Sequence, residues 1–280
     1  MTTPVEASNP HSALEVSRRH WRVPSGGVTS FLAVAAALAL LSLVTAVPAH
    51  AATAAKTVVL VHGAFADGSS WDKVIPLLLA KGLKVVAVQN PLTSLADDVA
   101  ATKRVLDGQT APVILVGHSW GGTVITQAGD DAKVAALVFV AAFAPDEGQA
   151  SADLGKDLPP PPGSTSIHPD AAGYLYLTPE GVAKDFAQDL PAAQTKVMAA
   201  TQGPILGKAF EEKVSTAAWK TKPSWYIVAE KDRMIQPDLE RAMAKKMKAN
   251  TTTLPTSHVA MLSRPKEVAA TILRAADAVK

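Results

Sequence analysis

Short apolar runs recur along the chain, and polar segments that contain glycine or proline separate them. The runs are rich in valine, isoleucine, leucine and alanine, and they are too short for buried helices. Continuous apolar runs of this length are typical of strands buried on both faces of a parallel sheet. The pattern therefore predicts strands over Lys56–Val61, Lys84–Val88, Pro112–Val116, Ala135–Ala141 and Ser224–Ala229, and a weaker, threonine-rich strand over Asn250–Leu254.

Between these runs, apolar residues recur three and four positions apart, which is the spacing of one helix face. Two of these segments open with a proline, which is tolerated in the first turn of a helix. Strands that alternate with helices predict crossover connections and an α/β fold, with a mostly parallel sheet flanked by helices. The predicted helices span Trp71–Ala80, Ser94–Leu106, Gly121–Ala128, Pro237–Met247 and Pro265–Val279.

The stretch from Asp146 to about Thr221 interrupts this alternation. It contains the proline run Pro159–Pro162 followed by Gly163, and no strand is expected in it. Helical pieces are predicted over residues 178–189, 192–200 and 208–218. We therefore expect a helical insertion, at about residues 146–221, that lies over the sheet.

The first 51 residues have the order of a secretory signal. Arg18, Arg19 and Arg22 precede an uncharged apolar run over Val28–Val47, and the small-residue site Ala49-His50-Ala51 follows. The adjacent arginines resemble a twin-arginine signal, although the match is loose. We expect cleavage near Ala51, which leaves residues 52–280 as a secreted, periplasmic or cell-envelope domain. The alternative is an uncleaved anchor over residues 28–47, since twenty apolar residues can span a bilayer.

Composition and charge exclude several classes of protein. Hydrophobic residues make up 48% and charged residues 19% of the chain, so most of it is expected to fold. The net charge of +2 gives no strong attraction to nucleic acid. Cysteine is absent, which excludes disulfides, thiolate metal sites and cysteine nucleophiles. We find no metal-ligand cluster and no dinucleotide-binding glycine pattern, and we expect no cofactor.

The segment Val113–Gly122 contains a Gly-x-Ser-x-Gly motif centred on Ser119. The motif alone is weak evidence, because an ordinary glycine turn gives the same letters. Here a predicted strand precedes it and a predicted helix follows, which is the context of a nucleophile elbow. In such a turn the serine backbone is strained and its hydroxyl projects above the sheet. The pattern therefore predicts Ser119 as a catalytic nucleophile.

A serine nucleophile needs a base, which is usually a histidine. Of the seven histidines, three fall in the signal and His118 lies inside the elbow. His62 ends the first strand and is expected to support its loop, while His168 falls in the insertion. His258 follows the last weak strand and precedes the last helix, so it is the predicted base.

The base needs an orienting carboxylate, which lies between the serine and the histidine in this chain order. Asp232 follows the strand Ser224–Ala229 and is the predicted carboxylate. Glu230 is the nearby competitor, and Asp238 is expected to be a helix-start charge.

Two backbone N–H groups are expected to form the oxyanion hole. Trp120, which follows the nucleophile, supplies one. The second is expected from the loop after the first strand, with Ala64 as the first choice and Phe65 as the second. Gly63 leaves room for a substrate carbonyl to approach the backbone.

These segments resemble the α/β-hydrolase superfamily from about Thr57 to the end of the chain. The motifs around His62-Gly63, Ser119, Asp232 and His258 are similar to those of its small single-domain group, which holds plant methyl-ester esterases, hydroxynitrile lyases and bacterial ester hydrolases. The resemblance implies that Ser119, Asp232 and His258 form a triad and that the insertion forms a cap. It also implies pocket residues in that cap, for which the candidates are Tyr174, Tyr176, Phe186, Met198 and Trp219, beside Gly63 and Phe65 in the first loop.

The sequence therefore predicts an exported serine hydrolase that cleaves small or medium-sized carboxylic esters. Its expected partner is a small-molecule ester, and contact with a membrane is expected only during export. Lyases of this group carry Thr where Gly63 stands and Lys where Val259 stands, so lyase activity is disfavoured. A cofactor-free perhydrolase or haloperoxidase shares the triad and stays an alternative. A non-catalytic small-molecule-binding relative is the other alternative.

Overall fold

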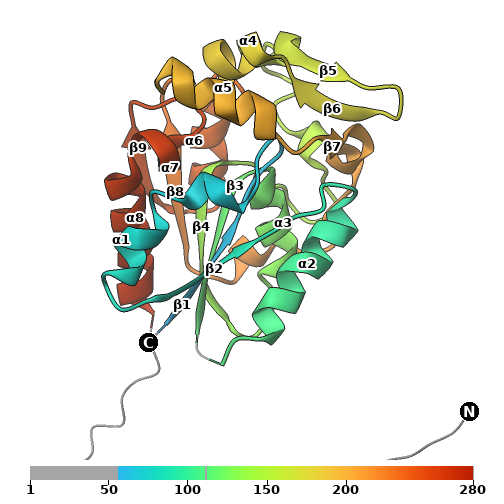
Figure 1. Ribbon diagram of the computed structural model, residues 1–280. Helices are drawn as coiled ribbons and strands as arrows, with labels where there is room; N and C mark the ends of the chain where they lie inside the picture. The colour runs from blue at the N-terminus through green and yellow to red at the C-terminus, as the bar shows by residue number, and fades with distance from the viewer. Residues whose placement is uncertain (1–55, 111, 280) are drawn as a thin grey trace, which may run out of the picture. The chain divides into compact units, whose positions relative to one another are not determined.

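Six strands form one parallel sheet in the computed structural model, which describes residues 56–110 and 112–279 (Figure 1). Every pair of neighbouring strands runs parallel, in the order β2-β1-β3-β4-β8-β9. The predicted α/β class is confirmed. The strands are β1 (Thr57–Val61), β2 (Lys84–Val88), β3 (Val113–Ser119), β4 (Val134–Ala142), β8 (Ser224–Ala229) and β9 (Asn250–Leu254).

Burial follows the position of each strand in the sheet. All residues of β1, β3 and β8 are buried, whereas the outermost strand β9 keeps Asn250, Thr251 and Thr253 exposed. The threonines of β9 suit an edge position, because one side of such a strand faces water. Each of the six predicted strands is present. The strand β3 continues three residues further than predicted, to Ser119, because these residues extend the ladder with β4.

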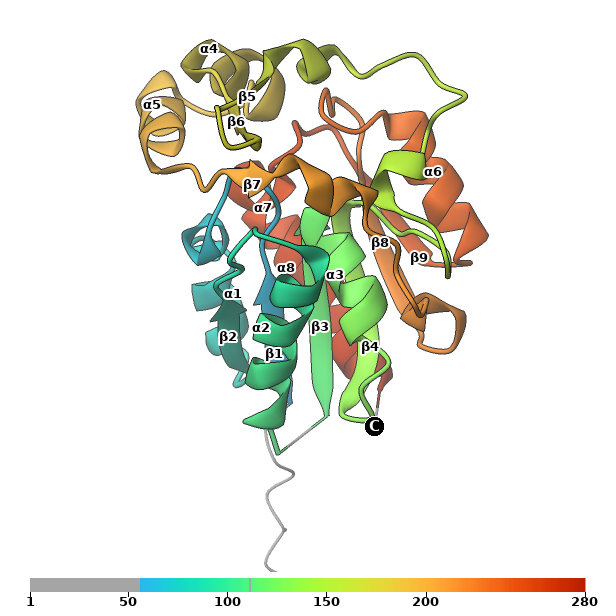
Figure 2. The same ribbon diagram turned by 90° about the vertical axis from the view of Figure 1, so that its right-hand side faces the viewer.

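Helices cover both faces of the sheet (Figure 2). One face carries α2 (Leu95–Asp107) and α3 (Trp120–Ala128), and the other carries α1 (Ile75–Leu79) and α8 (Pro265–Ala278). The helix α6 (Pro237–Lys246) packs against β8. The four-residue helix α7 (Ala260–Ser263) was not predicted, because it is too short to show a period. The prediction of a helix over Trp71–Ala80 is too long, since a 3-10 turn at Gly68–Trp71 precedes α1.

The insertion between β4 and β8 lies across the carboxyl ends of the sheet strands (Figures 1 and 2). It contains α4 (Pro179–Gly181), a wider helical turn over Val182–Phe186 and α5 (Ala192–Thr201). It also contains a small antiparallel sheet made of β5 (Ile167–Pro169), β6 (Tyr174–Leu177) and β7 (Ile205–Leu206).

Two predictions for this insertion were wrong. No strand was expected, yet three are present, since strands of two to four residues depend on pairing with distant segments and leave little local pattern. A helix was expected over residues 208–218, where the chain forms only a 3-10 turn at Gly207–Glu211 and a further one at Ala218–Lys220.

The predicted signal over residues 1–51, including the run Val28–Val47 and the site at Ala51, lies outside the described residues. Within the part that the structure describes, none of the helices has the length and apolar character that crossing a bilayer requires.

Candidate active site

Ser119 stands where β3 ends and α3 begins. Its backbone has φ 52° and ψ −121°, a strained conformation for a residue other than glycine. A Cβ atom on Gly117 would lie 2.5 Å from the carbonyl oxygen of Gly121, and one on Gly121 would lie 2.5 Å from that of Val61. Both glycines are therefore required for the close approach of strand, helix and first loop.

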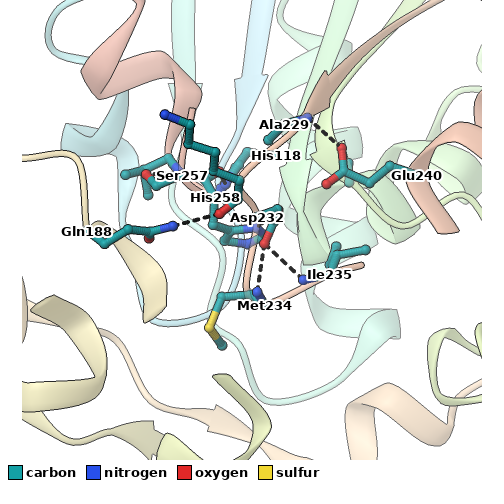
Figure 3. A network of polar contacts seen from close by, with 12 residues as sticks. His118, Gln188, Ala229, Asp232, Met234, Ile235, Glu240, Ser257 and His258 are labelled. Atoms are coloured by element: carbon teal, nitrogen blue, oxygen red, sulfur yellow. Dashed lines mark hydrogen bonds and ion pairs between the residues drawn. The ribbon is translucent and has the colours of Figure 1, made fainter. Parts of the chain in front are cut away.

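His258 and Asp232 form a buried pair beside this turn (Figure 3). Their Nδ1 and Oδ2 atoms are 2.5 Å apart. The other Asp232 oxygen, Oδ1, accepts hydrogen bonds from the backbone N–H groups of Met234 at 2.7 Å and Ile235 at 2.9 Å. These bonds fix the carboxylate and leave Oδ2 for the imidazole. The competitor Glu230 is exposed.

The backbone around His258 is held from two sides. The His118 ring has its Nε2 atom 2.9 Å from the His258 carbonyl oxygen, and Asp189 accepts the N–H of Ser257 at 2.9 Å. Burial lowers the pKa of His118 well below its usual value, so its ring is neutral and Nε2 donates to the carbonyl. The ring of Phe186 lies 5.2 Å from the His258 ring, between centroids.

Ser119 and His258 line the same small cavity of about 70 Å³. Among the described residues, no hydrogen bond involves the Ser119 hydroxyl. Such a bond is often long in a substrate-free enzyme and tightens when substrate binds. The rest of the wall is mostly apolar and includes Ala64, Phe65, Phe143, Phe186 and Phe210.

The first loop brings two backbone N–H groups near Ser119, and their environments differ. The Phe65 N–H donates to the carbonyl of Gly203 at 3.1 Å, and Phe65 has a positive φ of 62°. The Ala64 N–H has no partner within the described part of the chain. A Cβ atom on Gly63 would lie 2.6 Å from the Ser119 Cβ atom, so any side chain there would displace the serine. Of the two predicted donors in this loop, only the Ala64 N–H is without a partner among the residues that the structure describes.

Asp98 on α2 is a buried carboxyl group that contacts the Trp120 side chain. It was not predicted from the sequence. Its carboxylate accepts from the Trp120 indole Nε1 at 2.7 Å and from the Leu92 N–H at 2.8 Å. Burial raises the pKa of Asp98 to about 6, although these two hydrogen bonds favour its charged form. Asp98 lies three residues after Leu95, on the apolar face of α2, and this placement was the available signal.

Glu240 on α6 is a second buried carboxyl group that the sequence analysis missed. Its Oε2 atom accepts the N–H of Ala229 at 2.9 Å, at the end of the strand that leads to Asp232 (Figure 3). Its Oε1 atom has no partner among the described residues. Burial, followed by the Asp232 charge, raises the pKa of Glu240 well above its usual value. Burial therefore favours the protonated form of this carboxyl group.

The predicted pocket residues divide into two groups. Phe65 and Phe186 line the cavity with Ser119, and Met198 lines a neighbouring cavity that also includes Phe65. Tyr174 and Tyr176 line neither of these cavities. They alternate with Leu175 on β6, so they point to the opposite face of that strand.

The remaining predicted residues hold structural positions. Trp219 is buried and donates its indole N–H to the Pro145 carbonyl at 2.9 Å. His62 accepts the N–H of Asn90 at 2.9 Å, and burial lowers the pKa of its ring. His168 lies exposed on β5. Within residues 56–110 and 112–279, no group of three or more His, Cys, Asp or Glu side chains is placed to hold a metal ion.

The model of the alpha/beta hydrolase family matches residues 58–271, which is most of the chain. The protein belongs to the alpha/beta hydrolase family. The match begins within β1 and covers the other strands of the main sheet and the site residues from the first loop to His258.

This alpha/beta hydrolase is similar to plant enzymes along most of their length. It is 28% identical to methylesterase 3 of Arabidopsis thaliana, over 79% of this chain and 95% of the plant protein. It is 27% identical to an alpha-hydroxynitrile lyase of the same plant, over 75% and 93%. A crystal structure of a pyrethroid hydrolase from Sphingobium faniae has the same fold, with a TM-score of 0.68 and 24% identity over 80% and 98% of the chains. The family and its esterase relatives support a hydrolase of the esterase type.

Proposed function

We propose that this alpha/beta hydrolase is a serine hydrolase that cleaves carboxylic esters through an acyl-enzyme. The observation that carries the proposal is the buried His258–Asp232 pair, whose Nδ1 and Oδ2 atoms are 2.5 Å apart. His258 lines one cavity with Ser119, which stands on a strained turn. Nucleophile, base and orienting carboxylate in this arrangement are the parts that activate a serine hydroxyl. The similarity to plant methylesterases agrees with an ester substrate.

In this mechanism the His258 Nε2 atom takes the proton of the Ser119 hydroxyl as the serine oxygen attacks the ester carbonyl carbon. The bond to the alcohol oxygen then breaks, and the alcohol leaves with the proton that His258 returns. Water attacks the acyl-enzyme by the same two steps and releases the carboxylic acid. Asp232 holds the Nδ1 proton and stabilises the imidazolium, while its own position is fixed by the Met234 and Ile235 N–H groups.

The Ala64 and Trp120 N–H groups are proposed to stabilise the oxyanion. Trp120 is the first residue of α3, whose first N–H groups have no partner inside the helix. Among the described residues the Ala64 N–H has no partner, in contrast to that of Phe65. The positive end of the α3 dipole adds to the stabilisation of negative charge at this place.

The residues at positions 63 and 259 argue against a lyase reaction. Lyases of this group carry a threonine where Gly63 stands and a lysine where Val259 stands. Here a Cβ atom at Gly63 would lie 2.6 Å from that of Ser119, so a threonine would shift the serine. Val259 is buried and apolar. The two lyase side chains are thus absent, and one of them has no space.

Export is proposed from the order of charges and apolar residues in the first 51 positions. The mature protein would then begin near Ala52 and act outside the cytoplasm. N-terminal sequencing of the protein recovered from culture medium and from membranes tests this. A start near residue 52 in the medium is expected, whereas an intact N-terminus in the membrane fraction would support the anchor.

The hydrolase proposal is tested with a series of p-nitrophenyl esters and the full-length protein. Ser119→Ala is expected to lower kcat by about 10⁶-fold, since loss of the nucleophile removes the triad as a unit. Ser215→Ala, at an exposed serine, is the matched control and is expected to keep full activity. Ester hydrolysis that survives in Ser119→Ala would overturn the proposal. Wild-type protein without esterase activity would favour perhydrolysis or ligand binding.

A further inference from the structure

A second, larger cavity lies next to the one that contains Ser119. The two share five lining residues, which are Phe143, Ile167, Phe210, Met234 and Ile235. A single layer of side chains therefore separates them. This layer is apolar, and its Met234 side chain is flexible and adapts readily to a new neighbour. We call the larger cavity the proline groove, because Pro159, Pro160 and Pro161 form part of its wall.

The volumes of the two cavities differ in a way that bears on substrate size. The cavity around Ser119 measures about 70 Å³ and the proline groove about 470 Å³. An apolar cavity of about 150 Å³ holds one benzene molecule. The space at Ser119 is thus too small for an aromatic ring in this state, while the groove has room for about two or three rings. The cavity beside Met198 shares only Phe65 with the wall at Ser119, whereas the groove shares five residues with it, so a bulky ester is expected to extend from Ser119 into the groove.

Charge is missing from the walls of both cavities. Among the residues that the structure describes, no Asp, Glu, Lys or Arg side chain lines either of them. The polar side chains of the groove are Ser151, Ser164 and Gln236, and the Ser151 hydroxyl already bonds to Thr123 at 2.5 Å. A carboxylate in the groove would lose its hydration without gaining an ion pair. The groove therefore suits an uncharged, apolar group.

The proline groove is also attached to the loop of the catalytic pair. Gly163 donates its N–H to the Arg233 carbonyl at 2.7 Å, one residue after Asp232. A Cβ atom on Gly163 would lie 2.4 Å from the Met234 sulfur, so the two loops are in close contact. Arg233 also pairs with Asp185 of the insertion at 2.7 Å. The wall of the groove and the Asp232 loop are thus held together.

We infer that the proline groove is the specificity subsite for a bulky, uncharged, apolar group of the ester, while the cavity at Ser119 accepts only the ester group itself and small substituents. This inference rests on the proposed esterase function. The sequence predicts small or medium-sized esters. The groove has room for larger ones, with two or three fused or linked rings on one side of the ester.

Leu239→Trp tests the subsite, because Leu239 lines the proline groove and not the cavity at Ser119. The test measures kcat/KM, by titration of the acid released, for ethyl acetate, for ethyl naphthylacetate and for naphthylmethyl acetate, which places the rings on the alcohol side. A naphthyl ester bearing an added carboxylate is the charged comparison. Leu79→Trp, at a half-exposed position on α1, is the matched control.

In Leu239→Trp we expect the ratio of kcat/KM for the better naphthyl ester to that for ethyl acetate to fall by about tenfold or more. The ratio is expected to stay unchanged in Leu79→Trp. The added carboxylate is expected to lower kcat/KM of the wild type by about tenfold or more, since nothing in the groove pairs with it.

An unchanged ratio in Leu239→Trp would overturn the subsite, even if both activities fall together, because equal losses indicate a general structural defect. If the naphthyl ester that bears a carboxylate is hydrolysed as well as the uncharged one, the inference that the groove selects uncharged groups would be wrong. Failure of the underlying function gives a different result. In that case Ser119→Ala would hydrolyse p-nitrophenyl acetate as fast as the wild type, and the subsite would fall with the esterase proposal.

Discussion

Asp98 and Glu240 are buried carboxyl groups that lie one layer behind the residues of the proposed reaction. Asp98 holds the indole of Trp120, and Glu240 holds the Ala229 N–H at the end of β8. Both lie on helices next to exposed acidic residues, which makes them resemble ordinary surface charges in the sequence. What separates them is their position on the buried face, since Glu240 lies three residues before Met243.

Replacement of Asp98 by asparagine is expected to change the pH dependence of stability. The folded pKa of Asp98 is raised to about 6 by burial, so folding takes up a proton where the unfolded carboxyl is ionised. The stabilising contribution is complete below about pH 4 and is lost as the pH rises through about 6. The free energy of unfolding of the wild type should therefore fall, relative to Asp98→Asn, by about 3 kcal/mol between pH 3 and pH 7.

Urea unfolding at several pH values measures this difference, in which the other titrating groups cancel. A difference that does not vary with pH, or that rises with pH, would contradict the raised pKa. It would show that the N–H donors of Leu92 and Trp120 keep the carboxylate charged in spite of its burial.

That Asp232 and His258 lie together could be predicted from the sequence because each follows a recognisable strand. Asp232 comes after β8 and His258 after β9, and parallel strands bring their carboxyl ends to one edge of the sheet. The choice between Ala64 and Phe65 could only be ranked. It depends on a hydrogen bond to Gly203, which is 138 positions away from Phe65 in the chain (203 minus 65).

At the scale of elements, β3, α3 and the end of β1 meet so closely that no side chain fits between them. Gly121→Ala is expected to lower the free energy of unfolding by about 2–3 kcal/mol, because its Cβ atom would lie 2.5 Å from the Val61 carbonyl oxygen, a backbone atom with little freedom to move. Gly108→Ala is the matched control, since its nearest neighbour would be 3.6 Å away. It should change stability by about 0.5 kcal/mol or less.

Thermal and urea unfolding of the two variants test this joint. Equal midpoints for Gly121→Ala and Gly108→Ala would mean that β1 and α3 separate without cost, and the steric reason for the second glycine of the motif would be wrong.

The strands of the main sheet could be predicted from the sequence, whereas the short strands of the insertion could not. The strands of the main sheet are buried apolar runs, so the local sequence carries their signal. The strands β5, β6 and β7 have only two to four residues, and the Tyr174–Leu177 segment could equally continue into a helix. The segment is a strand because Leu175 pairs with Ile205, which is distant in the sequence.

At the scale of the whole described domain, the two ends of the insertion are joined by a charged cluster. Asp146 at its start binds Lys220 at its end, at 2.5 Å, and Lys246 on α6, at 2.8 Å. Both ammonium groups also lie within 6 Å of the Trp219 ring centroid, at 5.9 and 5.7 Å. The cluster therefore holds both ends of the insertion together and against α6.

Asp146→Asn is expected to lower the free energy of unfolding at pH 7 by about 1 kcal/mol, a modest value because the pairs are partly exposed and screened by water. The hydrogen bonds from Lys220 and Lys246 lower the pKa of Asp146 to about 2. A lowered pKa gives stability that is present above about pH 4 and is lost as the pH falls toward 2. The difference in the free energy of unfolding between wild type and variant should therefore shrink in acid, and also in about 0.5 M salt.

Glu180→Gln, which breaks an exposed pair within one helical segment, is the control and should have a smaller effect at pH 7. If Asp146→Asn is no more destabilising than this control, the cluster does not hold the two ends of the insertion together.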